Sequence, residues 1–316
     1  MIGFILAAGF GTRLRPITDH IPKALVPVCG EPLLGRAINF LRSQGMERIA
    51  VNVHHHPDQV RAFLDSRKQG CELFHETGRI RGTGGALYFA KEFLASDDIV
   101  CVANVDIVAA IDLKKLCGAF VALNCSAGLV AIPAEDGTVL YNAQSKDYIG
   151  ARSEALSRVH EPGGKGAGAE FLGIAFYKRE VLAVLDEADF SILPVWKRIQ
   201  GTGMSVKIVE TPPMYWKDLG TPAGLAAIHF DALDGTCQMR VPPNLVVDKE
   251  GKKAYPRSLD PAVAARLGPY SWVDTDVIPA TATLSRTVVF KDAAVPEGTV
   301  LKNAIVTSYG VIPLVS

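Results

Sequence analysis

The sequence lacks an excess of charge of either sign. It has 33 lysines and arginines against 33 aspartates and glutamates, so its formal net charge is zero. Proteins that bind nucleic acids or anionic membranes through their overall field carry a basic excess. Neither partner is therefore expected, and any phosphate chemistry must be local to one site.

Long apolar runs and paired cysteine motifs are also missing. No apolar run approaches the roughly 20 residues that a bilayer-spanning helix needs, and the start has no basic leader with a cleavage site. The six cysteines are scattered without CxxC spacing, which gives no sign of a zinc site or a disulfide framework. We expect a cytoplasmic protein in a reducing compartment, with no membrane contact.

Short apolar runs alternate with amphipathic helical patterns through the first two-thirds of the chain. Residues 3–9, 48–54 and 97–106 are typical of buried strands, and residues 33–45 and 57–70 are typical of helices. This order predicts an α/β fold, a Rossmann-like and mostly parallel sheet with helices on both faces. Such sheets bind ligands at the carboxyl ends of their strands.

The pattern changes after about residue 235. A proline-rich stretch is followed by aliphatic residues that recur every five or six positions: Val277, Ala282, Val288, Ala294, Val300 and Ile305. A six-residue period is typical of β-helix coils. We expect a main domain over residues 1–235. Residues 236–316 would form a linker and a small β segment resembling a short left-handed β-helix, or else an irregular set of strands.

The first predicted strand leads into the small-residue segment LAAGFGTRL. Gly9 and Gly11 have no Cβ, so backbone N–H groups there can approach phosphate oxygens closely. Arg13 adds a charged fork and Lys23 a movable point charge for the same anion. A GxxxxGK[ST] motif is absent, and Leu14 stands where a dinucleotide fingerprint has its third glycine, which disfavours a dinucleotide-dependent oxidoreductase.

The segment LAAGFGTRLRPITDHIPKALVPVCGEPL, residues 6–33, resembles the signature of the NDP-sugar pyrophosphorylases, the sugar-1-phosphate nucleotidyltransferases. The resemblance implies that an NTP and a sugar 1-phosphate react, with Mg²⁺, to give an NDP-sugar and pyrophosphate. It implies catalytic roles for Arg13 and Lys23, with Lys23 also contacting the sugar phosphate. The nucleotide-binding residues that it implies in this segment are Leu6, Ala7, Ala8, Gly9, Gly11, Thr12 and Arg13.

Three further segments are similar to the same family. RGTGGA resembles its base-reading segment, which places Gly82, Thr83 and Gly84 at the nucleobase. Asp106 ends a predicted strand and Asp218 lies in WKDLGTP, and the resemblance implies that both bind Mg²⁺, Asp106 beside the nucleotide. Carboxylate oxygens are ligands that Mg²⁺ prefers. The sequence departs from the family where Val105 replaces a common glycine.

The sugar phosphate is expected near the segment VHEP and the strand that follows it. Glu161 resembles the glutamate of the family's EKP segment, but the lysine is missing, and Lys165 is either its replacement or a solvated loop residue. Gly173 matches a glycine that lets the sugar lie against the backbone. Asn142 and Glu170 are further candidate contacts.

The base, the sugar and the role of the C-terminal segment stay open. The RGTGGA form and the β-helix-like end favour a mannose- or heptose-1-phosphate guanylyltransferase that uses GTP. The alternative is a uridylyltransferase that uses UTP and a glucose, GlcNAc or MurNAc 1-phosphate. A non-catalytic nucleotide-sugar-binding regulatory subunit is a third hypothesis, against which the two metal carboxylates argue. The C-terminal segment would form a homo-oligomer interface or a lid.

Overall fold

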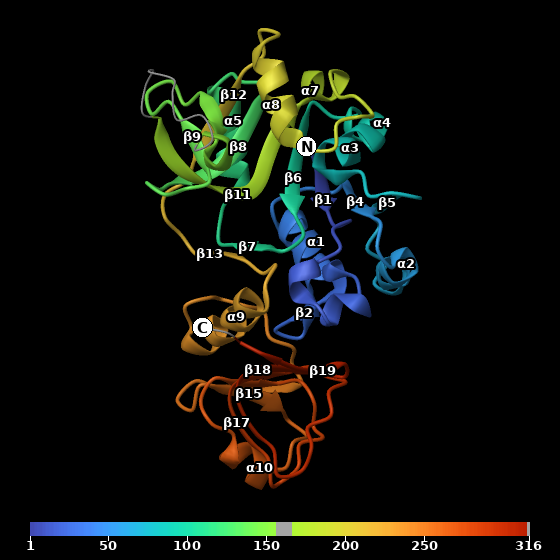
Figure 1. Cartoon of the computed structure of the whole chain (residues 1–316), viewed down its shortest axis with the longest axis vertical. Coiled ribbons are helices and arrows are strands. Elements are labelled where there is room, and N and C mark those ends of the chain that lie inside the picture. Colours follow the sequence, from blue (N-terminus) through green and yellow to red (C-terminus); the bar gives the residue numbers. More distant parts are fainter. Residues whose placement is uncertain (156–165, 315–316) are drawn as a thin grey trace. The chain divides into compact units, whose positions relative to one another are not determined.

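The computed structural model describes residues 1–155 and 166–314, with the backbone alone for Glu154 and Ala155. The chain forms two compact units (Figure 1). Unit 1 comprises Met1–Gly9 and Ala37–Trp216, and unit 2 comprises Phe10–Arg36 and Lys217–Ser316. Unit 2 includes residues 10–36 and 217–235 of the expected main domain together with residues 236–316, and the expected domain boundary at residue 235 stays a prediction.

Unit 1 is built on a nine-stranded mixed sheet in the order β10-β9-β11-β6-β1-β4-β5, with β8 paired to β11 and to β12. Strands β5, β4, β1 and β6 are parallel, as expected, whereas β11 runs antiparallel to β6, β8 and β9. The strands are β1 (Ile2–Leu6), β4 (Ile49–Val53), β5 (Glu72–His75), β6 (Ile99–Asn104), β8 (Ala127–Pro133), β9 (Val139–Tyr141), β10 (Tyr148–Ala151), β11 (Ala167–Lys178) and β12 (Val206–Glu210).

Helices cover both faces of this sheet, which confirms the predicted α/β class. Gly3 on β1 lies against Leu41 of α1, and Gly128 on β8 lies against Phe120 of α5. On the opposite face, Trp196 of α8 is fully buried in the core cluster that includes Phe4. The helices are α1 (Leu33–Ser43), α2 (Pro57–Ser66), α3 (Gly82–Phe89), α4 (Lys91–Leu94), α5 (Leu113–Ala122), α6 (Arg152–Ala155), α7 (Arg179–Ala183) and α8 (Ile192–Gln200).

The strand register brings three polar or site residues to one edge of the sheet. Leu6, the last residue of β1, lies opposite Asn52 on β4 and opposite Asn104 on β6. Because these strands are parallel, their carboxyl ends meet at this edge. The chain continues from β6 through Val105 and Asp106 into β7 (Ile107–Ala109).

Unit 2 joins the segment after β1 to the C-terminal sheet. The segment consists of short 3-10 turns, η1 (Thr12–Leu14), η2 (Ile17–Asp19) and η3 (Lys23–Leu25), and of a hairpin of β2 (Pro27–Val28) and β3 (Glu31–Pro32). After β13 (Trp216–Asp218), the remaining elements are α9 (Pro222–Asp234), β14 (Leu245–Asp248), β15 (Lys253–Pro256), α10 (Pro261–Arg266), β16 (Ser271–Val273), β17 (Thr283–Val289), β18 (Val300–Thr307) and β19 (Gly310–Pro313).

The C-terminal strands form one six-stranded sheet in chain order, β14 to β19. Strands β15 to β18 are parallel neighbours, which is consistent with β-helix-like coils. The six-residue period predicted that six aliphatic side chains face inward, and three of these six predictions are wrong. Ala282, Val288 and Ile305 are buried, but Val277 and Val300 are 71% and 76% exposed, and Ala294 is exposed. Val277 and Ala294 lie in connections and Val300 begins β18, so none of them reaches the core.

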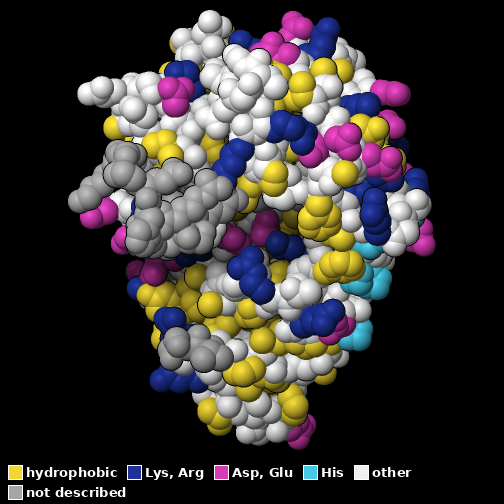
Figure 2. Space-filling model, turned by 45° about the horizontal axis from the view of Figure 1, so that its top comes forward, with side chains coloured by type: hydrophobic (Ala, Val, Ile, Leu, Met, Phe, Trp, Pro, Cys, Tyr) yellow, Lys and Arg dark blue, Asp and Glu magenta, His cyan; other side chains and the backbone are white. Residues whose placement is uncertain are grey.

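The surface shows no dominance of one charge where it can be seen. Lysine and arginine side chains alternate with aspartate and glutamate side chains over the upper part of the face in Figure 2. Within the described part of the chain, no helix is both long and apolar enough to cross a membrane.

Candidate functional site

A cavity of about 100 Å³ lies at the carboxyl ends of β1 and β6 in unit 1. It brings together three residues that the sequence singled out, Leu6, Thr83 and Gly173. It also contains residues that the sequence analysis missed, because aromatic and amide side chains at strand ends carry no local signal of a site. The main lining residues are Leu6, Thr83, Asn104, Phe171, Gly173 and Trp196.

Gly173 is required at this cavity by two separate features. Its φ of +72° is in the left-handed region, which side chains rarely adopt. A Cβ there would also come within 2.8 Å of the Asn104 amide nitrogen. The backbone conformation and the packing on Asn104 thus explain this glycine, and its contact with the sugar stays a prediction.

The segment that begins α3 packs against the loop before α8. A Cβ on Gly82, whose φ is +69°, would lie 2.1 Å from the Phe190 carbonyl oxygen, and one on Gly84 would lie 2.6 Å from that of Asp189. The Ile192 N–H donates to the Thr83 hydroxyl at 2.9 Å. The glycines are thus needed for packing on protein backbone, whatever they also allow a nucleobase to do.

The residues after β1 and β6 turn inward before the chain leaves unit 1. Ala7 and Ala8 are both 4% exposed, whereas Gly9 is exposed. Asp106 is buried, and its neighbour Val105, the departure from the family pattern, is buried as well. The Val105 side chain therefore points into the protein interior.

In unit 2, the segment from Gly11 to Lys23 folds back on itself. Gly11 has a left-handed φ of +65°, and its Cα approaches the Lys23 side chain so closely that an added Cβ would lie 3.0 Å from the Lys23 Cβ. The Thr18 hydroxyl donates to the Gly11 carbonyl at 2.8 Å. The structure therefore places two of the expected phosphate-binding residues side by side, with Thr12 exposed between them in sequence.

Arg13 and Asp218 also lie together in unit 2. One guanidinium nitrogen of Arg13 is 3.9 Å from a carboxylate oxygen of Asp218, and the side chains are 61% and 43% exposed. The other Asp218 oxygen accepts a hydrogen bond of 2.6 Å from the Gly220 N–H. Thr221 follows as the N-cap of α9, accepting from the Gly224 N–H. The tight turn holds the Asp218 carboxylate in place, and more than half of the Arg13 side chain is exposed to solvent.

The remaining sugar-site candidates differ in how they are placed. The Asn142 side-chain oxygen accepts from the Gln144 and Ser145 N–H groups at 2.9 and 3.1 Å, which forms the turn between β9 and β10. A Glu170 carboxylate oxygen accepts from the Thr138 N–H at 3.1 Å. Glu161 and Lys165 lie outside the described residues. All four assignments stay predictions.

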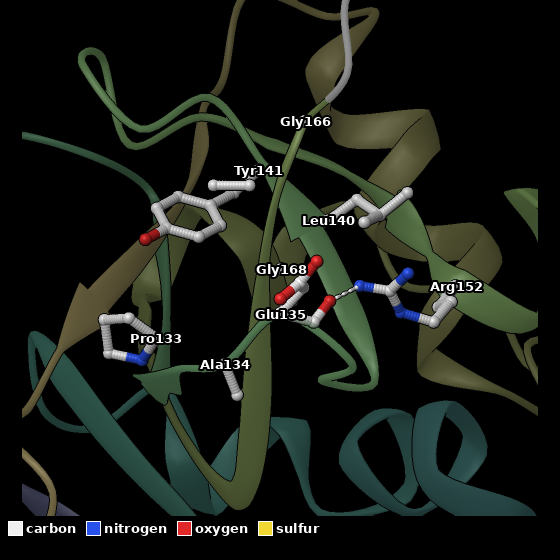
Figure 3. Close-up of a pocket in the computed structure, with 9 residues that line it drawn as sticks. Pro133, Ala134, Glu135, Leu140, Tyr141, Arg152, Gly166 and Gly168 are labelled. Carbon is white, nitrogen blue, oxygen red and sulfur yellow. Dashed lines mark hydrogen bonds between the residues drawn. The ribbon is translucent and has the colours of Figure 1, made fainter.

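A second hollow in unit 1, of about 740 Å³, lies beside β9, β11 and the end of β8 (Figure 3). Arg152, which lines the hollow, donates hydrogen bonds to the backbone carbonyls of Glu135 and Gly137. Tyr141 donates to Glu210 at 2.5 Å. Burial and this carboxylate raise the pKa of Tyr141 to about 12, so its phenol remains a donor. The Arg152 guanidinium and the Tyr141 phenol are thus both bonded to protein groups beside the hollow.

The donor chemistry of the two predicted metal ligands suits a hard cation. In the described residues, no group of three or more histidine, cysteine, aspartate or glutamate side chains is placed to hold a metal. Mg²⁺ takes only one or two protein carboxylates and completes its shell with phosphate oxygens and water. Asp106 in unit 1 and Asp218 in unit 2 each offer carboxylate oxygens of the kind that Mg²⁺ binds, and their joint role as its ligands stays a prediction.

Comparisons with known proteins confirm the family resemblance that the sequence indicated. A family model described as nucleotidyl transferase matches residues 2–235. The N-acetylmuramate alpha-1-phosphate uridylyltransferase of Caulobacter vibrioides is 30% identical over 240 residues, 72% of this chain and 95% of that protein. The mannose-1-phosphate guanylyltransferase catalytic subunit beta of Drosophila melanogaster is 33% identical over 168 residues, 48% of this chain and 44% of that protein. The match thus spans less than half of the Drosophila protein.

Solved structures share the fold of the chain. HddC from Yersinia pseudotuberculosis, in complex with GMP-PN, has a TM-score of 0.58 at 22% identity and covers 72% of this chain and 97% of its own. The inositol-1-phosphate CTP transferase from T. maritima has a TM-score of 0.56 at 15% identity and covers 71% of this chain and 90% of its own. At these identities the likeness concerns the fold.

Proposed function

Because the chain belongs to the nucleotidyl transferase family, we propose that it transfers a nucleotidyl group from an NTP to a sugar 1-phosphate. A phosphate oxygen of the sugar phosphate attacks the α-phosphorus. The bond from the α-phosphorus to the bridging oxygen breaks, and pyrophosphate leaves with the electron pair. The attacking group is already an anion, so no covalent enzyme intermediate is needed. The work of the protein is to align two polyanions and to offset their repulsion.

The observation that carries the proposal is the cavity at the ends of β1 and β6, which gathers Leu6, Thr83 and Gly173. Here the nucleoside would bind, along Ala7 and Ala8 and beside the α3 segment, and the sugar would lie against Gly173. In unit 2, Gly11, Thr12 and Lys23 would bind the phosphates. Arg13 would stabilise the pyrophosphate as it leaves.

Asp106 and Asp218 are the proposed ligands of Mg²⁺, which supplies positive charge to the phosphates when it is bound. The Asp218 carboxylate is 43% exposed and one of its oxygens is fixed by the Gly220 N–H, which supports this assignment, because a metal ligand must be accessible and held in place. Metal dependence is tested by removing divalent ions with EDTA and restoring them one at a time.

For the substrate pair, we propose GTP with a mannose- or heptose-type sugar 1-phosphate. The second candidate is UTP with an amino-sugar 1-phosphate. It is favoured by the Caulobacter uridylyltransferase, whose similarity covers 95% of its length. The six cysteines, all in described parts of the chain, form no disulfide bonds with one another, which supports a cytoplasmic location. Homo-oligomer formation through the C-terminal sheet stays a prediction.

Pyrophosphate release from a matrix of five NTPs and the candidate sugar phosphates tests this function. We expect one NTP and one sugar 1-phosphate to exceed all other pairs. Arg13→Ala is the negative control for contaminating activity. If no pair releases pyrophosphate while nucleotide binding persists, the protein is a regulatory subunit and the transferase proposal fails. NAD(P)H binding without pyrophosphate release would overturn the assignment entirely.

A further inference from the structure

Two buried polar side chains connect the end of β1 to the start of α3. The Ala7 N–H donates to the Asn52 side-chain oxygen at 2.7 Å. The Asn52 amide nitrogen donates to one carboxylate oxygen of Glu76 at 2.7 Å, and the other oxygen accepts from the Arg81 N–H at 2.7 Å. These contacts form one continuous chain from Ala7 to Arg81, which we call the polar bridge.

The polar bridge lies fully inside unit 1. Asn52 is 2% exposed and Glu76 is 0% exposed. Water cannot replace a lost contact there, so a mismatched donor or acceptor carries its full desolvation cost. The bridge follows the carboxyl ends of three neighbouring strands, because Leu6 pairs with Asn52 and Val53 pairs with His75.

The two ends of the bridge are the places where the proposed nucleotide site begins. Ala7 is the first residue after β1, and Arg81 precedes Gly82 and Thr83 at the start of α3. These segments are 75 residues apart, and they do not follow one another on a common strand or helix. Catalysis by alignment tolerates little displacement, since about 1 Å of misplacement can cost a hundredfold in rate.

We propose that Asn52 and Glu76 are positioning residues that set the distance between the Ala7 and Gly82 segments and thereby the affinity for the nucleotide. The inference rests on the proposed function. Both residues touch other protein groups in the bridge, so they act through Ala7 and Arg81. A residue that recognised the base or the sugar directly would contact the ligand itself.

The order of donors and acceptors makes the proposal testable. Both ends of the bridge are backbone N–H groups, so the two side chains must present an oxygen at each end. Glu76→Gln puts two amides in series. Whichever way the amides are turned, one N–H then faces another N–H. The double variant Asn52→Asp/Glu76→Gln restores every pair, because the carboxylate then stands at position 52 and accepts from both Ala7 and the new amide.

The experiment measures the KM of the preferred NTP, its direct binding by calorimetry, and the KM of the sugar 1-phosphate. For Glu76→Gln we expect the KM of the NTP and its Kd to rise about 10- to 100-fold, the range of one unsatisfied buried group. The KM of the sugar phosphate should change by less than about threefold. In the double variant, the nucleotide values should return to within about threefold of the wild type.

A matched control separates positioning from general stability. Gly128→Ala forces a Cβ to within 2.5 Å of the Phe120 ring, on β8 and away from the bridge. It should lower Tm and leave the KM of the NTP unchanged. An unchanged nucleotide KM in Glu76→Gln, or a double variant as weak as the single one, overturns the inference. A wild type that binds nucleotide but releases no pyrophosphate rejects the proposed function alone.

Discussion

Two parts of the proposed nucleotide site are built in different ways. In unit 1, the Leu6–Ala8 and Gly82–Gly84 segments are tied by the polar bridge and by backbone packing, with little exposed charge. In unit 2, residues 11–23, here called the phosphate segment, are short 3-10 turns with charged side chains in solvent. The first part resembles a protein core, and the second resembles a surface loop held at a few points.

This difference predicts whether a mutation should change the stability of the protein or the rate of its reaction. A buried polar or tightly packed group adds to stability and to shape, so its loss lowers both. An exposed cation adds little to stability, because solvent screens its interactions. The same cation contributes much more to the reaction rate, when it stabilises the charge that develops on a phosphate in a closed site. Stability and rate should therefore respond to different residues.

The largest effect is expected at Arg13. Arg13→Ala should lower kcat by about 10²- to 10³-fold, the usual cost of losing one group that stabilises transition-state charge. Tm should be unchanged, since the side chain is 61% exposed. Steady-state kinetics and thermal unfolding measure the two.

Arg15→Ala is the matched control for Arg13→Ala. Arg15 is equally exposed, lies two residues away and pairs with Asp19 in the same turn. We expect its removal to change kcat by less than about threefold. Equal losses in both variants would show a general need for positive charge, and the contrast between the two parts of the site would then lose its strongest support.

The next effect is a pH dependence of stability that arises from Asp274 in unit 2. Burial raises the pKa of Asp274 to about 6 from its ordinary 3.8, although the Trp272 N–H and the Arg36 guanidinium act in the opposite direction. The folded state thus binds a proton more tightly than the unfolded state, and its stability falls as pH rises from about 4 through 6. Asp274→Asn should remove this loss and stabilise the protein at pH 8 by up to about 3 kcal/mol.

Urea unfolding at several pH values checks this prediction. The advantage of Asp274→Asn should shrink towards zero near pH 4, where the wild-type carboxyl is protonated. His229 acts with the opposite sign, because burial lowers its pKa to about 4 from 6.5. The stability that it contributes is therefore present above pH 6.5 and is lost as pH falls to 4. Asp292→Asn, at an exposed position, is the control for the removal of one surface carboxylate. A constant difference between Asp274→Asn and wild type at all pH values would contradict the assignment.

A smaller effect is expected where α3 packs on the loop before α8. Gly84→Ala places a Cβ 2.6 Å from the Asp189 carbonyl and should cost about 1–3 kcal/mol of stability as the loop moves. Gly118→Ala on α5 is the control, since a Cβ there meets nothing within 4 Å. That change should stabilise by up to about 1 kcal/mol. Denaturant unfolding compares them, and equal effects of the two changes would contradict tight packing at α3.

The sequence predicted the parts of this molecule that local patterns encode. Buried runs marked β1, β4 and β6, and the family signature marked Gly11, Arg13 and Lys23, which unit 2 holds within one segment. A strand buried on both faces reads as an apolar run whatever follows it. The motif residues are recognisable because phosphate chemistry restricts which side chains can serve.

The rest depended on contacts between distant segments. Asn52 and Glu76 looked like ordinary polar residues at strand ends until the pairing of β1, β4 and β5 joined them. The sequence around Gly82 does not indicate its close approach to the Phe190 carbonyl, which lies 108 residues further along the chain. The six-residue period failed because aliphatic spacing does not tell strand from connection: Val277 lies before β17 and is exposed.

The smallest effect tests how the phosphate segment is held. The rings of His20 and Tyr309 stack at 3.8 Å with an angle of 11°, which ties the segment to the turn between β18 and β19 within unit 2. Such ring pairs contribute about 0.5–1.5 kcal/mol, so Tyr309→Ala should lower kcat/KM by about 2- to 10-fold. Tyr309 is 42% exposed, so the loss of this stacking energy should lower Tm by only about 1–4 °C. Tyr309→Phe keeps the ring and should behave as wild type.

The two tyrosine variants distinguish the ring from the hydroxyl. If Tyr309→Phe is as slow as Tyr309→Ala, the hydroxyl group is what matters and stacking is not the tie. If neither variant is slower, the contacts within residues 11–23, such as the Thr18 bond to Gly11, hold the phosphate segment without the C-terminal sheet. A loss confined to Tyr309→Ala would mean that the C-terminal sheet steadies a charged loop through one exposed contact, where unit 1 uses a buried chain of three hydrogen bonds.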